Sequence, residues 1–159
     1  MKKIVQLLSF WALSFTLAQA AVDQDELDRL LAAGATELAL SLLQEDVPAD
    51  AESWRVQQKQ KLDIYRQQQN WRAMLDEVVR ASAFELPPAD LQWLQTQAAI
   101  AYLGQGDGVA ARDVLMSLLW AKEENNTLFR QWRELVARSY LVDGRYEDAN
   151  TAALRYEQD

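Results

Sequence analysis

Three glycines within five residues, Gly104, Gly106 and Gly108, constrain the fold of this chain more than any other feature. They lie between two runs rich in alanine and leucine, which favour helix. Inside one continuous helix each glycine would cost about 1 kcal/mol relative to alanine, and three would cost about 3 kcal/mol. Such a loss is a large part of the net stability of a small domain. We therefore expect the chain to turn here, so that two helices fold back on each other.

The same spacing of small, aromatic and turn residues occurs four times along the chain. One segment contains Ala99, Tyr102, Gly106, Gly108 and Ala111, separated by three, four, two and three positions. The other segments with these separations are Leu27, Leu30, Gly34, Thr36 and Ala39; Leu62, Tyr65, Gln69, Trp71 and Met74; and Ala137, Tyr140, Gly144, Tyr146 and Ala149. The second residues of successive segments lie 35, 37 and 38 residues apart, which indicates an internal repeat.

Each repeat has the features of a helical hairpin. Its first small or apolar residue and the residue three positions later lie on one face of a helix. The glycine four positions further on ends that helix, because glycine readily takes a positive φ. A hairpin of this kind buries its apolar face only by stacking on its neighbours. The spacing predicts an all-α fold with helices over residues 23–33, 35–45, 51–68, 70–83, 89–104, 107–122, 127–142 and 146–157.

The segment 137–149, ARSYLVDGRYEDA, resembles the tetratricopeptide repeat (TPR), whose period is about 34 residues. The resemblance covers residues 21–159 and implies a right-handed α-solenoid of about four stacked TPR-like hairpins. Three segments depart from the pattern, since the first matches it weakly, Gln69 replaces the turn glycine in the second and Gly108 replaces the aromatic residue in the third. Another α-solenoid or a helical bundle also fits the residues.

In TPR proteins the first helices of successive hairpins line a groove that holds a peptide or protein segment, so the resemblance implies a similar strip here. The residues expected to face it are Val56, Lys59, Asp63 and Arg66, then Trp93, Thr96, Ile100 and Leu103, and then Gln131, Glu134, Arg138 and Leu141. Buried aromatic residues and arginines carry much of the energy of protein interfaces, and the strip contains both. The alternative is that these are ordinary solvated or packing residues.

The tryptophans and the predicted helix ends refine this layout. Trp71 stands where the TPR pattern takes an aromatic residue, and we expect it in the core. Trp120 and Trp132 fit packing between helices, because aromatic residues at helical spacing are more often core residues than ligand contacts. The expected N-caps are Asp50 for the third helix and Asn126 or Thr127 for the seventh.

The first twenty residues have the features of a secretory signal peptide. Two lysines follow Met1, residues 4–17 are mostly apolar, and Ala18-Gln19-Ala20 matches a signal peptidase site. We expect cleavage near Ala20 and Ala21 and export to the periplasm or beyond, since the short lysine-led start is typical of bacteria. The alternative is an uncleaved anchor, although the apolar run is short for a bilayer.

The charge of the chain narrows the choice of partner. The sequence has 16 basic and 24 acidic residues, a formal net charge of −8. Removal of residues 1–20 takes away Lys2 and Lys3 and leaves 14 − 24 = −10. A surface this acidic repels phosphate backbones and anionic lipids. We therefore expect a protein or peptide partner, no nucleic acid and no stable membrane span after cleavage.

The composition excludes much catalytic and metal-binding chemistry. The chain has no cysteine and no histidine, so disulfides, thiol nucleophiles, imidazole bases and the common zinc ligand sets are absent. Asp107 stands between two glycines, yet the segment lacks the alternating oxygen ligands of a calcium loop and the lysine of a phosphate loop. We expect no catalytic residue, no metal site and no cofactor.

Three functional hypotheses fit these features. The first is a non-catalytic periplasmic TPR-like scaffold or adaptor that binds a protein or peptide partner in a cell-envelope assembly. The second is the N-terminal helical superhelix of a larger exported cell-wall enzyme of the lytic transglycosylase type, because no polar capping helix follows the fourth repeat. The third is self-association into a homo-oligomer through the uncapped end.

Overall fold

The computed structural model describes residues 23–121 and 127–157. Over these ranges the expected all-α class is confirmed, because the described residues form eight helices and no strand. The helices are α1 (Gln24–Ala32), α2 (Thr36–Glu45), α3 (Ala51–Gln67), α4 (Trp71–Ser82), α5 (Pro88–Gln105), α6 (Gly108–Trp120), α7 (Phe129–Val142) and α8 (Tyr146–Glu157). These bounds agree with the expected ones to within two residues.

The predicted signal peptide, residues 1–20, lies outside the described residues, and so does its cleavage site. Within the described ranges, every helix is too short or too polar to cross a bilayer.

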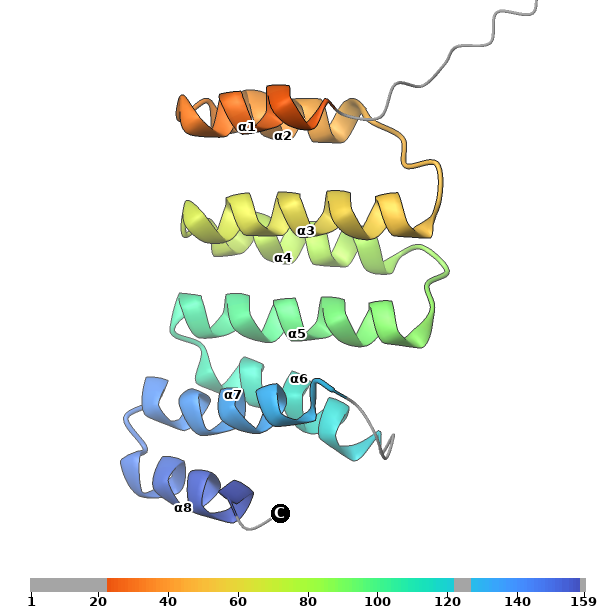
Figure 1. Ribbon diagram of the computed structural model, residues 1–159. Coiled ribbons are helices and arrows are strands. Elements are labelled where there is room, and N and C mark those ends of the chain that lie inside the picture. Colours follow the sequence, from red (N-terminus) through yellow and green to blue (C-terminus); the bar gives the residue numbers. More distant parts are fainter. Residues whose placement is uncertain (1–22, 122–126, 158–159) are drawn as a thin grey trace, which may run out of the picture.

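The helices follow one another through the molecule in chain order (Figure 1). Each helix packs on the next one in sequence, and the other contacts between described helices join α3 with α5 and α5 with α7. The helices α1 and α2 therefore lie at one end of the stack, and α7 and α8 lie at the other (Figure 1). As a result, each end has a described neighbour on one side only.

The core consists of two clusters of buried side chains. The first joins α1 to α5 and includes Leu27, Leu62 and Met74. The second joins α5 to α7 and includes Leu115 and Trp132. Helix α5 supplies side chains to both clusters, so the core is continuous along the stack.

Four turns share one backbone geometry, which confirms the predicted turn positions. The turn residues Gly34, Gln69, Gly106 and Gly144 have φ of +73°, +54°, +83° and +71°. In each turn an amide donates to the carbonyl oxygen five residues earlier: Ala35 to Leu30 at 2.8 Å, Asn70 to Tyr65 at 2.9 Å, Asp107 to Tyr102 at 2.9 Å and Arg145 to Tyr140 at 2.8 Å. Gln69 adopts the left-handed conformation without the freedom that glycine has, so its backbone is strained.

The three clustered glycines have different roles. Gly106 forms the turn itself, with φ of +83°. A side chain on Gly104 would collide with the ring of Trp71 on α4, and one on Gly108 would collide with the carbonyl oxygen of Ser139 on α7. The two flanking glycines therefore allow neighbouring helices to approach closely, while the middle one reverses the chain.

The predicted helix caps are right for α3 and wrong for α7. Asp50 Oδ1 accepts a hydrogen bond from the Ser53 amide at 2.8 Å, and Ser53 Oγ accepts one from the Asp50 amide at 3.1 Å. The bond from the Ser53 amide lowers the pKa of Asp50. The N-cap of α7 is Leu128, which has no acceptor side chain, because Thr127 lies in the turn before it. Asn126 lies outside the described residues.

The tryptophans divide between core and surface. Trp132 is 1% exposed, and Trp71 is partly buried against the first cluster, so both predictions are confirmed. Trp120 is 78% exposed, and its predicted role in helix packing is wrong. Helix α6 packs through Leu115 and Leu118, and Trp120 lies on another side of the helix at its last residue.

Candidate functional site

The predicted groove residues on α3 are only partly accessible. Lys59 is exposed, whereas Asp63 and Arg66 are about half-buried. Arg66 Nη1 lies 3.6 Å from Asp63 Oδ1, and its Nη2 donates to Oε1 of the buried Gln97 on α5 at 2.5 Å. Arg66 therefore ties α3 to α5, and Lys59 is the cation of this group that remains accessible.

The predicted groove residues on α5 lie against the core. Trp93 and Ile100 are partly buried and pack on the first cluster. Thr96 is 1% exposed, and its hydroxyl oxygen accepts a hydrogen bond from Trp132 Nε1 at 2.7 Å. The prediction of Thr96 as a groove residue is therefore wrong, because α7 covers it.

Glu134 and Arg138, two of the four predicted residues on α7, are exposed and lie in one cleft, which Gln131 does not line. The cleft has a volume of about 1080 Å³ and runs along α7 beside α8. Its other lining residues are Phe129, Arg130, Arg133, Ala137 and Leu141 from α7 and Ala153 and Tyr156 from α8. The α8 residues were not predicted, because the groove was expected on the first helices of the hairpins alone.

The repeat spacing shows what covers the corresponding surface elsewhere in the molecule. Residues 38 positions apart pair as Thr96 with Glu134, Ala99 with Ala137, Ile100 with Arg138, Leu103 with Leu141, Leu115 with Ala153 and Leu118 with Tyr156. On α5 and α6 these positions belong to the interface with α7, and four of the six residues are buried in the cluster that contains Trp132. On α7 and α8 no described helix covers them, so the cleft is open.

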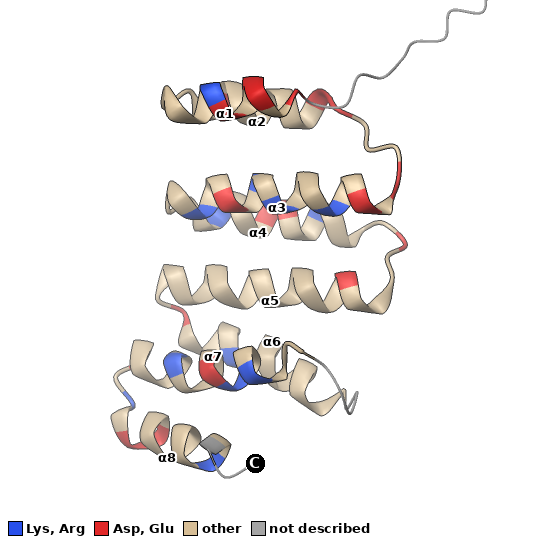
Figure 2. Cartoon of the chain, in the orientation of Figure 1, with Lys and Arg blue, Asp and Glu red and all other residues tan. Residues whose placement is uncertain are grey.

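The cleft is basic, although the protein is acidic. Arg130, Arg133 and Arg138 line it together with a single carboxylate, Glu134. Figure 2 shows basic and acidic positions in blue and red along the ribbon of α7. The chain as a whole has a formal net charge of −8. The cleft therefore favours negative groups locally, in a chain whose net charge is negative.

Aromatic rings form one wall of the cleft. The guanidinium carbon of Arg133 lies 4.6 Å from the ring centre of Phe129 and 5.2 Å from that of Tyr156. These cation–π contacts hold the arginine along the wall. Burial raises the pKa of Tyr156, and the charge of Arg133 opposes that shift.

The side chains of the cleft are suited to binding another molecule through polar and apolar contacts. Its guanidinium groups can donate paired hydrogen bonds to carboxylates, its rings offer apolar surface, and Glu134 can accept a hydrogen bond. Glu134 has no second carboxylate beside it in the lining, as a general acid–base pair would need. Across the described ranges, no group of three or more histidine, cysteine, aspartate or glutamate side chains could hold a metal ion.

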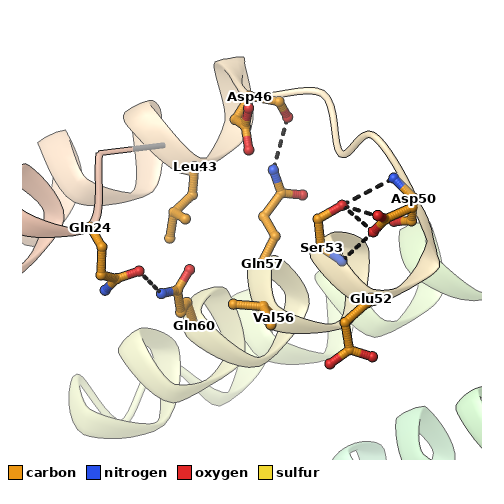
Figure 3. A pocket seen from close by; sticks show the side chains of 9 residues that line it. All are labelled: Gln24, Leu43, Asp46, Asp50, Glu52, Ser53, Val56, Gln57 and Gln60. Carbon is orange, nitrogen blue, oxygen red and sulfur yellow. Dashed lines mark hydrogen bonds between the residues drawn. The ribbon is translucent and has the colours of Figure 1, made fainter. Parts of the chain in front are cut away.

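A smaller hollow of about 380 Å³ lies between the α1–α2 end and α3 (Figure 3). Gln60 Nε2 donates to Gln24 Oε1 at 2.8 Å, and Gln57 Nε2 donates to the carbonyl oxygen of Asp46 at 2.8 Å (Figure 3). These bonds use the polar groups of the hollow to join neighbouring helices. We interpret the hollow as part of the packing between α3 and the α1–α2 end of the stack.

Two ion pairs between successive hairpins of the described chain were not predicted from the sequence. Arg55 Nε donates to Asp90 Oδ1 at 2.6 Å, and this bond raises the pKa of Arg55. Arg112 pairs with Asp143 and lies 4.4 Å from the ring centre of Tyr140. The paired residues are 35 and 31 positions apart, close to one repeat. Opposite charges one repeat apart were the signal that could have revealed them.

Comparisons of this chain with protein-family models, with curated proteins and with solved structures found no match. The features that bear on its function are therefore the spacing of its turns, the contacts between its layers and the open cleft beside α7 and α8.

Proposed function

We propose that this protein is a TPR-like adaptor, a right-handed α-solenoid of about four stacked hairpins that binds a protein partner in a cell-envelope assembly. Support for the solenoid comes from the four turns of common geometry and from helices that contact only near neighbours in the chain. Support for a binding role comes from the cleft on α7 and α8.

The main support for a binding role is a leucine that is exposed on α7 although its equivalent in the preceding repeat is buried. Leu103 on α5 is 6% exposed, whereas Leu141, which occupies the same place in the next repeat, is 51% exposed. It lies in the cleft beside Arg138 and near Tyr156. Exposed apolar surface next to arginine and aromatic side chains is typical of protein interfaces.

Export to the periplasm is part of this proposal. It rests on the lysine-led apolar start and the small residues that precede Ala21. The negative charge of the chain also favours a protein partner over nucleic acid.

Recovery of a partner from envelope extract tests the adaptor function. Arg138→Ala removes a donor and Ala153→Glu fills the cleft, so each should reduce recovery about tenfold relative to the wild type. Both residues are exposed, so neither change disturbs the core. Arg72→Ala is the matched control, because it removes an exposed arginine of α4 outside the cleft and outside the predicted strip. Equal recovery by all four proteins would remove the cleft as the binding site.

The open face also suits a second function, the helical part of a larger exported cell-wall enzyme of the lytic transglycosylase type. In that case a further hairpin would lie on α7 and α8. A reading frame that continues past Asp159 into a domain with a catalytic glutamate would favour the enzyme, and a stop codon directly after Asp159 would exclude it.

A further inference from the structure

We propose that the cleft along α7 and α8 binds an amphipathic helix of a partner protein, with an aromatic residue at its centre and acidic residues at its flanks. This assignment rests on the proposed adaptor function and gives the chemistry of the partner. The bound helix lies on α7 and α8 as α7 lies on α5 and α6.

The packing of α7 is the template for the bound helix. Trp132 is 1% exposed, and its Nε1 donates to Thr96 Oγ1 on α5 at 2.7 Å. Leu135 and Val136, three and four positions later, are 8% and 2% exposed and belong to the same cluster. A helix that covers such a surface therefore presents an aromatic residue at position i and apolar residues at i+3 and i+4.

The cleft provides counterparts for these contacts. Glu134 takes the position of Thr96, so its carboxylate is placed to accept the N–H of an indole ring. Ala153 takes the position of Leu115, and the smaller side chain leaves room for a large ring. Tyr156 supplies an apolar wall.

The arginines specify the flanks of the bound helix. Arg130, Arg133 and Arg138 stand where α5 has two glutamines and an isoleucine. Acidic side chains on the bound helix would pair with the guanidinium groups of Arg130 and Arg138, which gives orientation and specificity more than affinity. The acidic remainder of the protein repels such a helix, so the cleft is the favoured place for it.

A second copy of this chain fits the cleft less well than a partner helix. Its free acidic helix would be α1, in which Asp25 and Glu26 occupy the positions of Leu135 and Val136. Both carboxylates are exposed, and docking would bury them against apolar side chains at a cost in desolvation. Helix α1 therefore has acidic flanks without the apolar centre.

The first residue of the second helix in each repeat indicates which way the bound helix runs. In three repeats this residue contacts the end of the first helix of the next repeat: Thr36 Oγ1 accepts from Gln68 Nε2 at 2.5 Å, Trp71 lies against Gly104, and Gly108 lies against the Ser139 carbonyl. The fourth such residue, Tyr146, is 71% exposed. A bound helix parallel to α7 brings its last turn to Tyr146. A small residue in that turn would leave space for the tyrosine ring.

A peptide made from residues 127–142 of this chain is the probe, with Gln131, Arg133 and Arg138, which lie at the edges of its contact face, each replaced by glutamate. It keeps the aromatic and apolar residues of α7 and gains acidic flanks. Binding of the fluorescein-labelled probe to the exported protein is measured by fluorescence anisotropy. The unmodified peptide controls for charge, and a probe with Trp132→Ala controls for the ring. We expect the acidic probe to bind about tenfold more tightly than either control.

Variants of the protein locate the binding site. Arg138→Glu and Ala153→Glu should each weaken probe binding about tenfold, because one reverses a paired charge and the other fills the cleft. Arg72→Glu makes the same charge change on the exposed part of α4 and should alter the affinity less than about twofold. Equal binding of the acidic and unmodified peptides would overturn the proposal, as would equal losses in Arg72→Glu and Arg138→Glu. A dimer of the wild type that Ala153→Glu dissociates would make a second copy the occupant and overturn it too.

Failure of this inference differs from failure of the adaptor function. If Ala153→Glu abolishes recovery of an envelope partner but the acidic probe does not bind, the adaptor function stands and the acidic helix is excluded. If neither partner recovery nor probe binding depends on the cleft, both proposals are wrong.

Discussion

The two ends of the helical stack differ in the side chains that they present at equivalent positions. On α1, Asp25 and Glu26 are exposed at the places where α7 has the buried Leu135 and Val136. At the other end, Leu141 keeps the apolar character of the interior position and is 51% exposed. One end has charged residues in place of core residues, and the other keeps the residues of an interface.

The two ends therefore differ in the surroundings that their side chains favour. The charged side chains of α1 favour solvent, and the apolar side chains at the α7–α8 end favour contact with another helix. The acidic residues of α1 lie in its first turn, where they interact favourably with the helix dipole. Around the cleft of α7 and α8, by comparison, apolar side chains are mixed with arginines at positions that an adjoining helix would cover. The surface that we propose for binding is therefore the one whose side chains stay apolar without being covered by a described helix.

The largest expected effect comes from a comparison of the buried ring of Trp132 with the exposed ring of Tyr146. Trp132→Ala should lower the free energy of unfolding by about 3–5 kcal/mol, because it empties a buried site and leaves Thr96 without its donor. Tyr146→Ala, at the open end, should change it by less than about 0.5 kcal/mol. Urea unfolding followed by circular dichroism measures both. A large loss in Tyr146→Ala would mean that the α8 end is covered.

The next effect tests the close approach of α6 and α7. Gly108→Ala should cost about 1–3 kcal/mol, because the new methyl group collides with the backbone carbonyl of Ser139, which cannot rotate away. Val109→Ala, at the exposed neighbouring position, controls for changes on the helix surface and should be close to neutral. A stabilisation of about 1 kcal/mol in Gly108→Ala, the value of helix propensity alone, would contradict the contact.

The fold was predictable as far as local backbone preference determines it. The spacing that placed turns at Gly34, Gly106 and Gly144 also placed one at Gln69, and all four adopt positive φ. Glycine freedom and helix periodicity are properties of short segments, so they can be read from one sequence. The cap of α7 was missed because the preference of Thr127 for capping competes with the turn that precedes the helix.

The candidate site was predictable only in part, because the sequence identifies the face of a helix but not what covers it. Thr96 and Glu134 share one position in the repeat. Helix α7 covers Thr96, whereas no described helix covers Glu134, which is exposed. Trp120 was misplaced for a related reason, since its helical spacing fits packing but its side of α6 meets no described helix. Coverage depends on the neighbouring layer, which periodicity within one helix cannot give.

A smaller effect compares the interior turn at Gln69 with the glycine turns around it. Gln69→Gly should raise the free energy of unfolding by about 0.5–1 kcal/mol, because it relieves a left-handed backbone strained by a side chain, while the greater entropy of unfolded glycine offsets part of the gain. Gly106→Ala should have the opposite effect, a loss of about 1 kcal/mol. Denaturant titration of both variants measures the pair. Destabilisation by Gln69→Gly would show that the glutamine side chain makes a contact worth more than the strain.

The smallest expected effect is the titration of Tyr156 at the open end. Burial raises its pKa above the ordinary value of 10.0, so folding favours the neutral phenol. Its contribution to stability is complete below the unfolded pKa and is lost as the pH rises through the folded pKa. An acidic helix in the cleft would add burial and negative charge, and both raise the pKa further. The difference in tyrosinate absorbance between the wild type and Tyr156→Phe, with and without the acidic peptide, measures this shift. Tyr146→Phe provides the comparison for an exposed ring, and an unchanged pKa of Tyr156 at saturating peptide would mean that the bound helix leaves this wall of the cleft uncovered.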